Sequence, residues 1–145
     1  MAKMVHQEQP LTDNEFQEFE RMFVRSAPNA LKSYYMSNNG GHTSEEDAEA
    51  GKFGLPVGGF HSIKYGKLTI EELVDDLGDI TPLEFGAWNK FAFIPFAHDE
   101  GSNIIFVSLR DNNYGSVYIF DPNVGNIAMV APSYEAFLVR LFKKE

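Results

Sequence analysis

The chain has 145 residues, 43% of them hydrophobic, with 12 basic and 21 acidic side chains and a formal net charge of −9. This length suits one domain with a sizeable core, and the excess of carboxylates excludes ordinary nucleic-acid binding because phosphates would be repelled. The absence of cysteine excludes thiol catalysis, disulfides and cysteine-ligated metal sites. Residues 1–10 are polar and no long apolar run follows, so we expect no membrane span, a cytoplasmic location, and a single domain over 1–145 with a flexible 1–10 segment.

Two helices are predicted in the first part of the chain. Thr12 and Glu15 have the spacing of a capping box, in which each residue bonds the other's backbone at a helix start. Pro28 suits the first turn of a second helix. The Asn-Asn-Gly-Gly sequence at 38–41 ends that helix, because these residues tolerate the left-handed backbone that a helix end needs.

A long polar loop is predicted over 42–59, followed by a short strand over 60–65. The loop contains the acidic cluster Glu45, Glu46 and Asp47, which has no basic neighbour in the sequence. Such a cluster is either a solvated loop or an acidic contact surface, and the sequence leaves both open.

The third predicted helix repeats the start signal of the first. Thr69 and Glu72 have the capping-box spacing, and Gly78 predicts the helix end. Asp75 and Asp76 lie near that end, where the helix dipole favours cations instead. A binding surface tolerates such a local conflict, and solvent exposure explains it almost as well.

The remainder of the chain predicts an antiparallel meander closed by a helix. The order of elements is typical of an α+β fold, with an antiparallel sheet and helices packed against it. Pro95 predicts a sheet edge or a strand end, because proline lacks a backbone donor. The predicted strands are 91–96, 103–109, 116–121 and 126–131, and the closing helix begins near Ser133.

No signature of catalysis is present. The sequence lacks a phosphate-binding Gly-Lys-Ser/Thr loop, a Gly-x-Ser-x-Gly elbow and a His-Glu-x-x-His helix. The four histidines, His6, His42, His61 and His98, fall in four separate segments without ligand spacing. We therefore expect no enzyme, no cofactor and no metal site.

Four short motifs follow one another in the order and spacing of a known family. The first motif is Ala27-Pro28 with Leu31, Tyr34 and the Asn-Asn-Gly-Gly sequence at 38–41 that ends the helix. The second is Ile94-Pro95-Phe96-Ala97, and the third is Gly115-Ser116-Val117-Tyr118. The fourth is Val130 to Tyr134 with Phe137 and Leu138. Together they resemble the SUKH superfamily, named partly after yeast cell-wall regulators and abundant among bacterial toxin-immunity proteins. The chain departs from the family pattern at Ala27, where leucine is usual, and in the length of the 42–59 loop.

The resemblance implies a SUKH-like single domain that neutralises a cognate secreted or contact-delivered toxin, as in contact-dependent growth inhibition. Such a toxin is often a nuclease with a basic cleft, at or near which an acidic protein can dock. We expect a monomer that binds neither nucleic acid nor membrane. The candidate contacts are the acidic residues Glu45, Glu46, Asp47, Asp75, Asp76, Asp79 and Glu84, with Phe85 and Trp88 as aromatic anchors.

Alternatives remain for the aromatic residues. Trp88 is equally understood as a buried core residue. A small-ligand or regulatory scaffold module without catalysis would place a deep pocket among Phe91, Phe93, Tyr118 and Phe120. Single-stranded nucleic-acid binding on an aromatic sheet lacks the basic groove that it needs.

Overall fold

A computed structural model describes residues 4–44, 46, 55 and 57–142, and most of its sheet strands follow one another in the second half of the chain. The described residues contain four α-helices and a five-stranded antiparallel sheet, which confirms the predicted α+β class. The helices are α1 (Asp13–Glu20), α2 (Asn29–Ser37), α4 (Ile70–Leu77) and α5 (Tyr134–Phe142). The strands are β1 (Met4–Val5), β2 (His42–Thr43), β3 (Gly59–Phe60), β4 (Phe93–His98), β5 (Ile104–Ser108), β6 (Val117–Phe120) and β7 (Ile127–Ala131).

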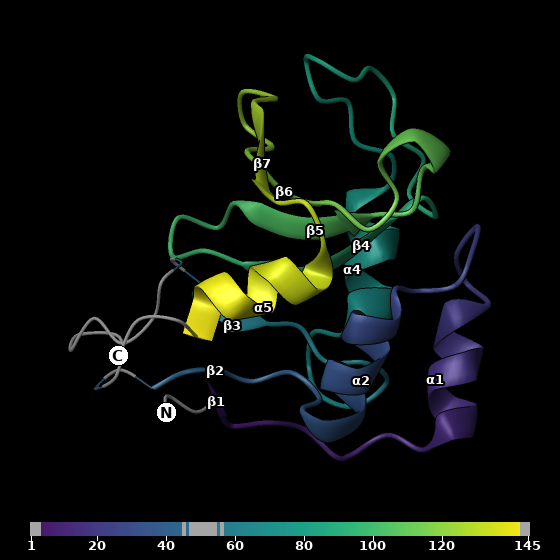
Figure 1. The fold of residues 1–145 in the computed structure, drawn as a ribbon, viewed down its shortest axis with the longest axis vertical. Coiled ribbons are helices and arrows are strands. Elements are labelled where there is room, and N and C mark those ends of the chain that lie inside the picture. Colours follow the sequence, from purple (N-terminus) through teal and green to yellow (C-terminus); the bar gives the residue numbers. More distant parts are fainter. Residues whose placement is uncertain (1–3, 45, 47–54, 56, 143–145) are drawn as a thin grey trace.

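The main sheet is a meander in the order β3-β4-β5-β6-β7, and a separate pair joins β1 to β2. Its central strand, β5, is buried along its whole length, as its continuously apolar sequence predicts. Successive side chains of a strand point to opposite faces, so the sheet has a core on each side. Figure 1 shows α2 and α5 below the sheet, while the loop after α4 rises above it.

The two faces of the sheet are covered by different parts of the chain. The helix-side core joins the sheet to all four helices, and Phe96 lies at its centre against Tyr134 and Phe137, with ring centroids 4.9 and 5.2 Å away. The opposite face is covered by the 78–92 loop, which the bridge between Ile80 and Trp88 holds in place. We call this second cluster the loop-side core; its buried members are Ile80, Trp88, Ala92, Phe93, Ile104, Phe106, Tyr118 and Phe120.

The predicted helix starts are present, with one difference. The Thr12 hydroxyl accepts a bond from the Glu15 amide at 3.2 Å, and the Glu15 carboxylate accepts from the Thr12 amide at 2.9 Å. The capping box of α1 is therefore confirmed. Thr69 accepts from the Glu72 amide at 3.2 Å, but within the described residues the return bond is not formed. The second capping box therefore has only the first of its two predicted bonds, and Glu72 is exposed.

The strand predicted over 60–65 is shorter than expected because a side chain replaces its partner strand. The Asn39 amide oxygen accepts from the Ile63 backbone N–H at 2.7 Å, and its nitrogen donates to the Ile63 carbonyl at 3.0 Å. The chain then turns at Lys64, whose φ is 64°. Pro95 lies inside β4, at an irregularity in the β4–β5 register, so it marks neither an edge strand nor a strand end.

The first described residues contact the segment that follows α2. Met4 and Val5 pair with Thr43 and His42, and the Glu8 amide donates to the Asn39 carbonyl at 2.9 Å. Residues 1–3 lie outside the described part. Among the described helices, none has the length and apolar character to cross a membrane.

Candidate partner-binding surface

Four of the predicted contact residues lie close together in the sequence, on α4 and in the loop that follows it. Asp75, Asp76, Asp79 and Glu84 are all exposed, and they follow α4 into the 78–92 loop. Glu72 joins them on the same helix. We call this set the acidic ridge, and it comprises Glu72, Asp75, Asp76, Asp79 and Glu84. Of the other predicted acidic contacts, Glu46 is exposed, whereas Glu45 and Asp47 lie outside the described residues.

The helix that carries the ridge is fixed from its buried side. Ile70 and Val74 are fully buried in the helix-side core, one turn apart. Helical geometry therefore turns Asp75 and Asp76 toward solvent. Gly78, with φ of 63°, ends the helix as predicted and leads directly to Asp79. The side chains of Glu72, Asp75 and Asp76 thus project from a helix that is anchored in the core, whereas Asp79 and Glu84 lie in the loop after it.

Little positive charge offsets the ridge. Lys90 is the one cation paired with it among the described residues, and its Nζ lies 3.8 Å from Asp75 Oδ1. The Lys90 backbone N–H also donates to Asp79 at 2.9 Å. Glu72, Asp76 and Glu84 form no ion pair in the part of the chain that the structure describes. Their charges are available to a basic partner.

Not every carboxylate on this side of the molecule is available in that way. Glu15 on α1 lies 2.7 Å from Lys64 Nζ and also accepts a hydrogen bond from the Tyr65 hydroxyl. The bonds from Lys64, Tyr65 and Thr12 lower the pKa of Glu15 to about 2. Glu71 accepts from the Lys64 backbone N–H at 2.9 Å. These two acidic residues hold α1 and α4 to the intervening turn, and in the ridge Asp79 holds the Lys90 backbone in a similar way.

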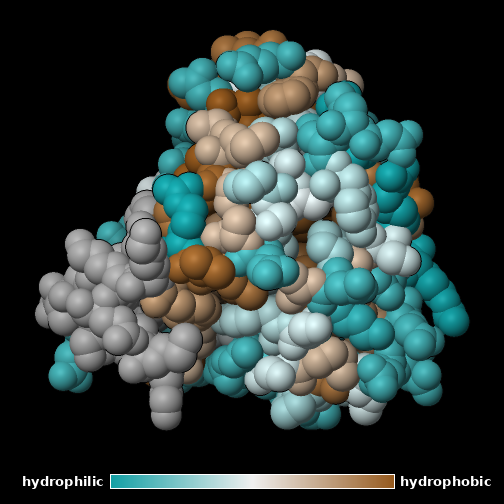
Figure 2. All heavy atoms as spheres, viewed as in Figure 1, coloured by the Kyte–Doolittle hydropathy of each residue, from teal (hydrophilic) through white to brown (hydrophobic). Residues whose placement is uncertain are grey.

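Two exposed apolar side chains lie near the end of the ridge that is in the 78–92 loop. Leu83 is 74% exposed and Val124 is 56% exposed, and the Leu83 amide donates to the Gly125 carbonyl at 3.0 Å. We call these two side chains the apolar tip. Figure 2 shows hydrophobic atoms at the upper end of the molecule, where the 78–92 loop and the β6–β7 turn lie in Figure 1. Sequence reasoning missed the tip, because an isolated leucine in an aperiodic loop carries no signal.

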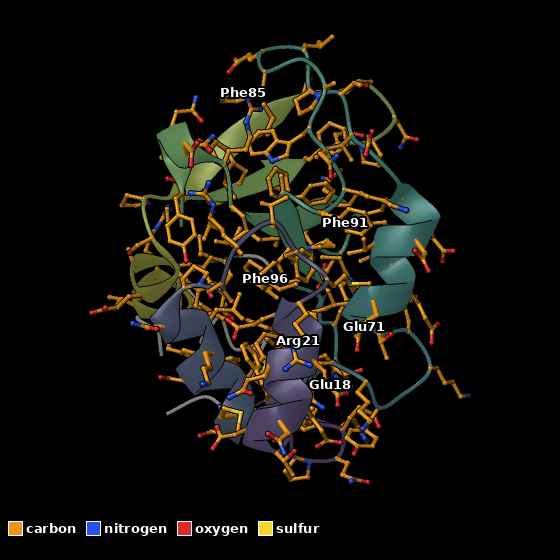
Figure 3. The ribbon with its side chains drawn as sticks, turned by 90° about the vertical axis from the view of Figure 1, so that its right-hand side faces the viewer. Glu18, Arg21, Glu71, Phe85, Phe91 and Phe96 are labelled. Carbon is orange, nitrogen blue, oxygen red and sulfur yellow. The ribbon has the colours of Figure 1, made fainter. Side chains whose placement is uncertain are left out.

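The predicted aromatic anchors need correction. Trp88 is fully buried, its Nε1 donates to the Ala92 carbonyl at 3.2 Å, and Arg110 lies over its ring at 4.7 Å. It is a core residue and presents no surface to a partner. Phe85 is half-buried, with its ring 5.2 Å from that of Trp88 and 5.6 Å from that of Tyr118. Figure 3 shows Phe85 at the top of the view, in the loop that leads from α4.

The pocket that a small-ligand module would need among the sheet aromatics is filled. Phe93, Tyr118 and Phe120 pack together in the loop-side core, and Phe91 is half-buried against the helix-side core. These side chains leave no deep pocket in the part of the chain that is described.

A different cleft, of about 620 Å³, is lined by all four histidines. We call it the histidine cleft. Sequence reasoning placed His6, His42, His61 and His98 in unrelated segments. Three contacts bring them together: the pairing of β1 with β2, the pairing of β3 with β4, and the bridge between Gly41 and Phe60. Within the described residues, no group of three or more potential ligands has the arrangement needed to hold a metal ion.

Comparison with known proteins agrees with the earlier resemblance. Residues 10–140 match the SMI1 / KNR4 family (SUKH-1), which is most of the chain and includes the ridge, the tip and both cores. No curated protein matches this chain. The superfamily is one of immunity proteins, generally non-catalytic, which bind cognate toxins. With its fold, its motifs and this match in agreement, the chain belongs to the SMI1 / KNR4 family (SUKH-1).

Proposed function

We propose that this protein is an immunity protein that neutralises a nuclease toxin delivered by secretion or by cell contact, and that it docks the acidic ridge at or near the toxin's active site. Family membership supports the immunity role. The observation that carries the docking mode is the ridge itself, in which five residues with carboxylates are exposed and one ion pair, between Asp75 and Lys90, is formed within the described residues.

The charge of the ridge favours a basic partner. A nuclease must bind phosphates and therefore presents Lys and Arg around its active site. Opposite charges on two surfaces steer their encounter and raise the association rate by up to several orders of magnitude at low salt. Speed matters for immunity, because the toxin has to be captured before it reaches nucleic acid. The net charge of −9 adds a longer-range attraction of the same sign.

The apolar tip supplies a hydrophobic contact, which adds affinity that charge attraction alone does not provide. Interfaces gain most of their affinity from a few well-packed side chains that become fully desolvated. Leu83 is already exposed and is positioned by a backbone hydrogen bond, and Phe85 behind it packs against the buried Trp88. The tip needs no rearrangement to enter an apolar pocket beside the toxin's basic cleft. The ridge then supplies the charged part of the interface, and the tip supplies an apolar contact at its loop end.

Charge reversal tests the docking mode. Where a toxin domain is encoded beside this gene, it is co-expressed with the wild-type chain, and survival and complex formation are scored. The Asp75→Lys/Asp76→Lys variant should associate about tenfold more slowly at low salt and show a flatter salt dependence. The control is Glu100→Lys/Glu135→Lys, which changes the net charge equally at two exposed residues away from the ridge.

Two results would contradict the proposal at different levels. If both double variants slow association equally, only net charge matters and the ridge has no specific role. If the wild-type chain neither rescues growth nor forms a complex, the immunity function against that toxin is wrong.

A further inference from the structure

The histidine cleft holds two close pairs of imidazole rings. The rings of His6 and His42 are stacked, with centroids 5.0 Å apart. Those of His61 and His98 lie 5.2 Å apart at an angle of 45°. The cleft is bounded by the β1–β2 pair, by β3 and the residues after it, and by Gly66 to Leu68. Its location is separate from the acidic ridge, with which it shares no residue.

The hydrogen bonds of two rings fix which ring nitrogen carries the proton in the neutral form. Nδ1 of His42 lies 2.9 Å from the Thr43 carbonyl oxygen, and Nδ1 of His98 lies 3.0 Å from the Asp99 carbonyl oxygen. A carbonyl oxygen only accepts, so each Nδ1 must be the donor. In the neutral ring, Nε2 is then a bare acceptor. When the ring gains a proton, Nε2 becomes a charged donor.

Access to one of these nitrogens depends on a glycine. A Cβ atom at Gly59 would lie 3.2 Å from Nε2 of His98, and one at Gly58 would lie 3.1 Å from Cε1 of the same ring. Any larger residue at 58 or 59 would cover the face of His98. The two glycines therefore leave room for a small ligand against this imidazole.

Few other charges face the cleft. Lys67 and Glu8 line it with opposite signs, and Ser62 adds a hydroxyl that is bonded to the Tyr65 carbonyl at 2.5 Å. The nearby Asp99 carboxylate is occupied by the backbone and side-chain nitrogens of Asn103, at 2.9 and 3.0 Å. With neutral imidazoles the charges of Lys67 and Glu8 cancel. Each proton that the rings take up makes the cleft more positive.

We infer that the histidine cleft binds a doubly charged oxyanion of the sulfate or phosphate class, and that its imidazoles take up protons as the anion binds. Two imidazolium rings about 5 Å apart repel each other, and an anion bound beside the pair, in the cleft, offsets that repulsion. By linkage, the anion then binds more tightly as the pH falls. Burial and the adjacent His98 lower the pKa of His61 to about 4, so this ring is neutral in the empty cleft at neutral pH.

Sulfate is the first probe, because its charge is constant across the pH range tested and any pH dependence then belongs to the protein. All four histidines of the chain line the cleft, so histidine imidazole NMR signals report on this site alone. Sulfate should bind about tenfold more tightly at pH 5.5 than at pH 7.5, in line with the gain of charge-assisted hydrogen bonds. A second titration with adenosine monophosphate tests whether a phosphate ester is preferred to the free ion.

Two variants locate the binding. Lys67→Gln removes an exposed cation from the cleft and should weaken sulfate binding about threefold to tenfold without unfolding the chain. Lys32→Gln on α2 removes the same charge outside the cleft and should leave binding unchanged. His98→Gln removes one ring of the cleft and should weaken sulfate binding at pH 5.5, with thermal unfolding as the check that it folds.

Three outcomes would overturn the inference. They are histidine signals that do not move with sulfate at pH 5.5, affinity that is equal at both pH values, or equal weakening by Lys67→Gln and Lys32→Gln. The Asp75→Lys/Asp76→Lys variant should keep the pH-dependent sulfate binding, so the result is independent of toxin docking.

Discussion

His61 makes folding stability depend on pH above the range in which carboxylates titrate. The ring lies half-buried in the histidine cleft, and desolvation together with the neighbouring His98 lowers its pKa from 6.5 to about 4. In the unfolded chain the same ring binds a proton near pH 6.5. Between these two values the unfolded state binds more protons than the folded state. Stability is therefore complete above pH 6.5 and is lost as the pH falls toward 4.

The size of this loss follows from the two pKa values. Each tenfold change in the protonation equilibrium is worth about 1.4 kcal/mol, so the whole interval costs about 3 kcal/mol. Between pH 7.5 and 5.5 the loss is about 1 kcal/mol, because only the upper part of the interval is crossed. Glu15, with its pKa lowered to about 2, contributes stability that is lost only below about pH 4.5, outside this range.

Urea denaturation at pH 7.5 and 5.5 measures the effect, in chloride buffers free of sulfate and phosphate. The free energy of unfolding of the wild-type chain should fall by about 1 kcal/mol. His61→Gln should reduce that fall to less than about 0.3 kcal/mol, since glutamine does not titrate. His6→Gln, at an exposed position of the same cleft, should retain most of it. An equal fall in the wild-type and His61→Gln chains would refute the assignment to this ring.

Four further predictions concern stability at neutral pH and are measured by the same denaturation. Trp88→Ala should lower the free energy of unfolding by about 3 to 5 kcal/mol, because it empties the centre of the loop-side core; a small loss would mean that Trp88 is not buried. Asn39→Ala should cost about 3 kcal/mol, since it leaves the Ile63 amide and carbonyl without their partner in a buried site; an unchanged midpoint would contradict that bonding. Tyr35→Phe should cost about 1 kcal/mol through the loss of the hydroxyl bonds to the His61 and Phe96 carbonyls, at 2.7 and 3.2 Å. Leu83→Ala should change stability by less than about 0.5 kcal/mol but weaken the toxin complex, and the reverse pattern would place Leu83 in the fold rather than the interface.

The helix ends and the central strand could be predicted from the sequence, because each depends on residues that are close together in the chain. The capping residue Thr12 starts α1, Gly78 ends α4, and Ser133 starts α5 by accepting a bond from the Ala136 amide at 3.0 Å. The buried central strand was likewise readable from its apolar run. Each of these features depends on neighbours within a few residues. The prediction of a strand over 60–65 failed because its backbone is satisfied by Asn39, which is 24 residues from Ile63.

Some features of the candidate site could likewise be predicted from the sequence, and others could not. Sequence alone determined that the chain is acidic, that it lacks the motifs of catalysis, and that Asp75 and Asp76 lie on the exposed side of an amphipathic helix. Only the tertiary structure decided that Trp88 is core, that Leu83 is exposed beside the ridge, and that four histidines share one cleft. Those facts depend on strand pairing and packing between distant segments, and such contacts leave no periodic trace in a single sequence.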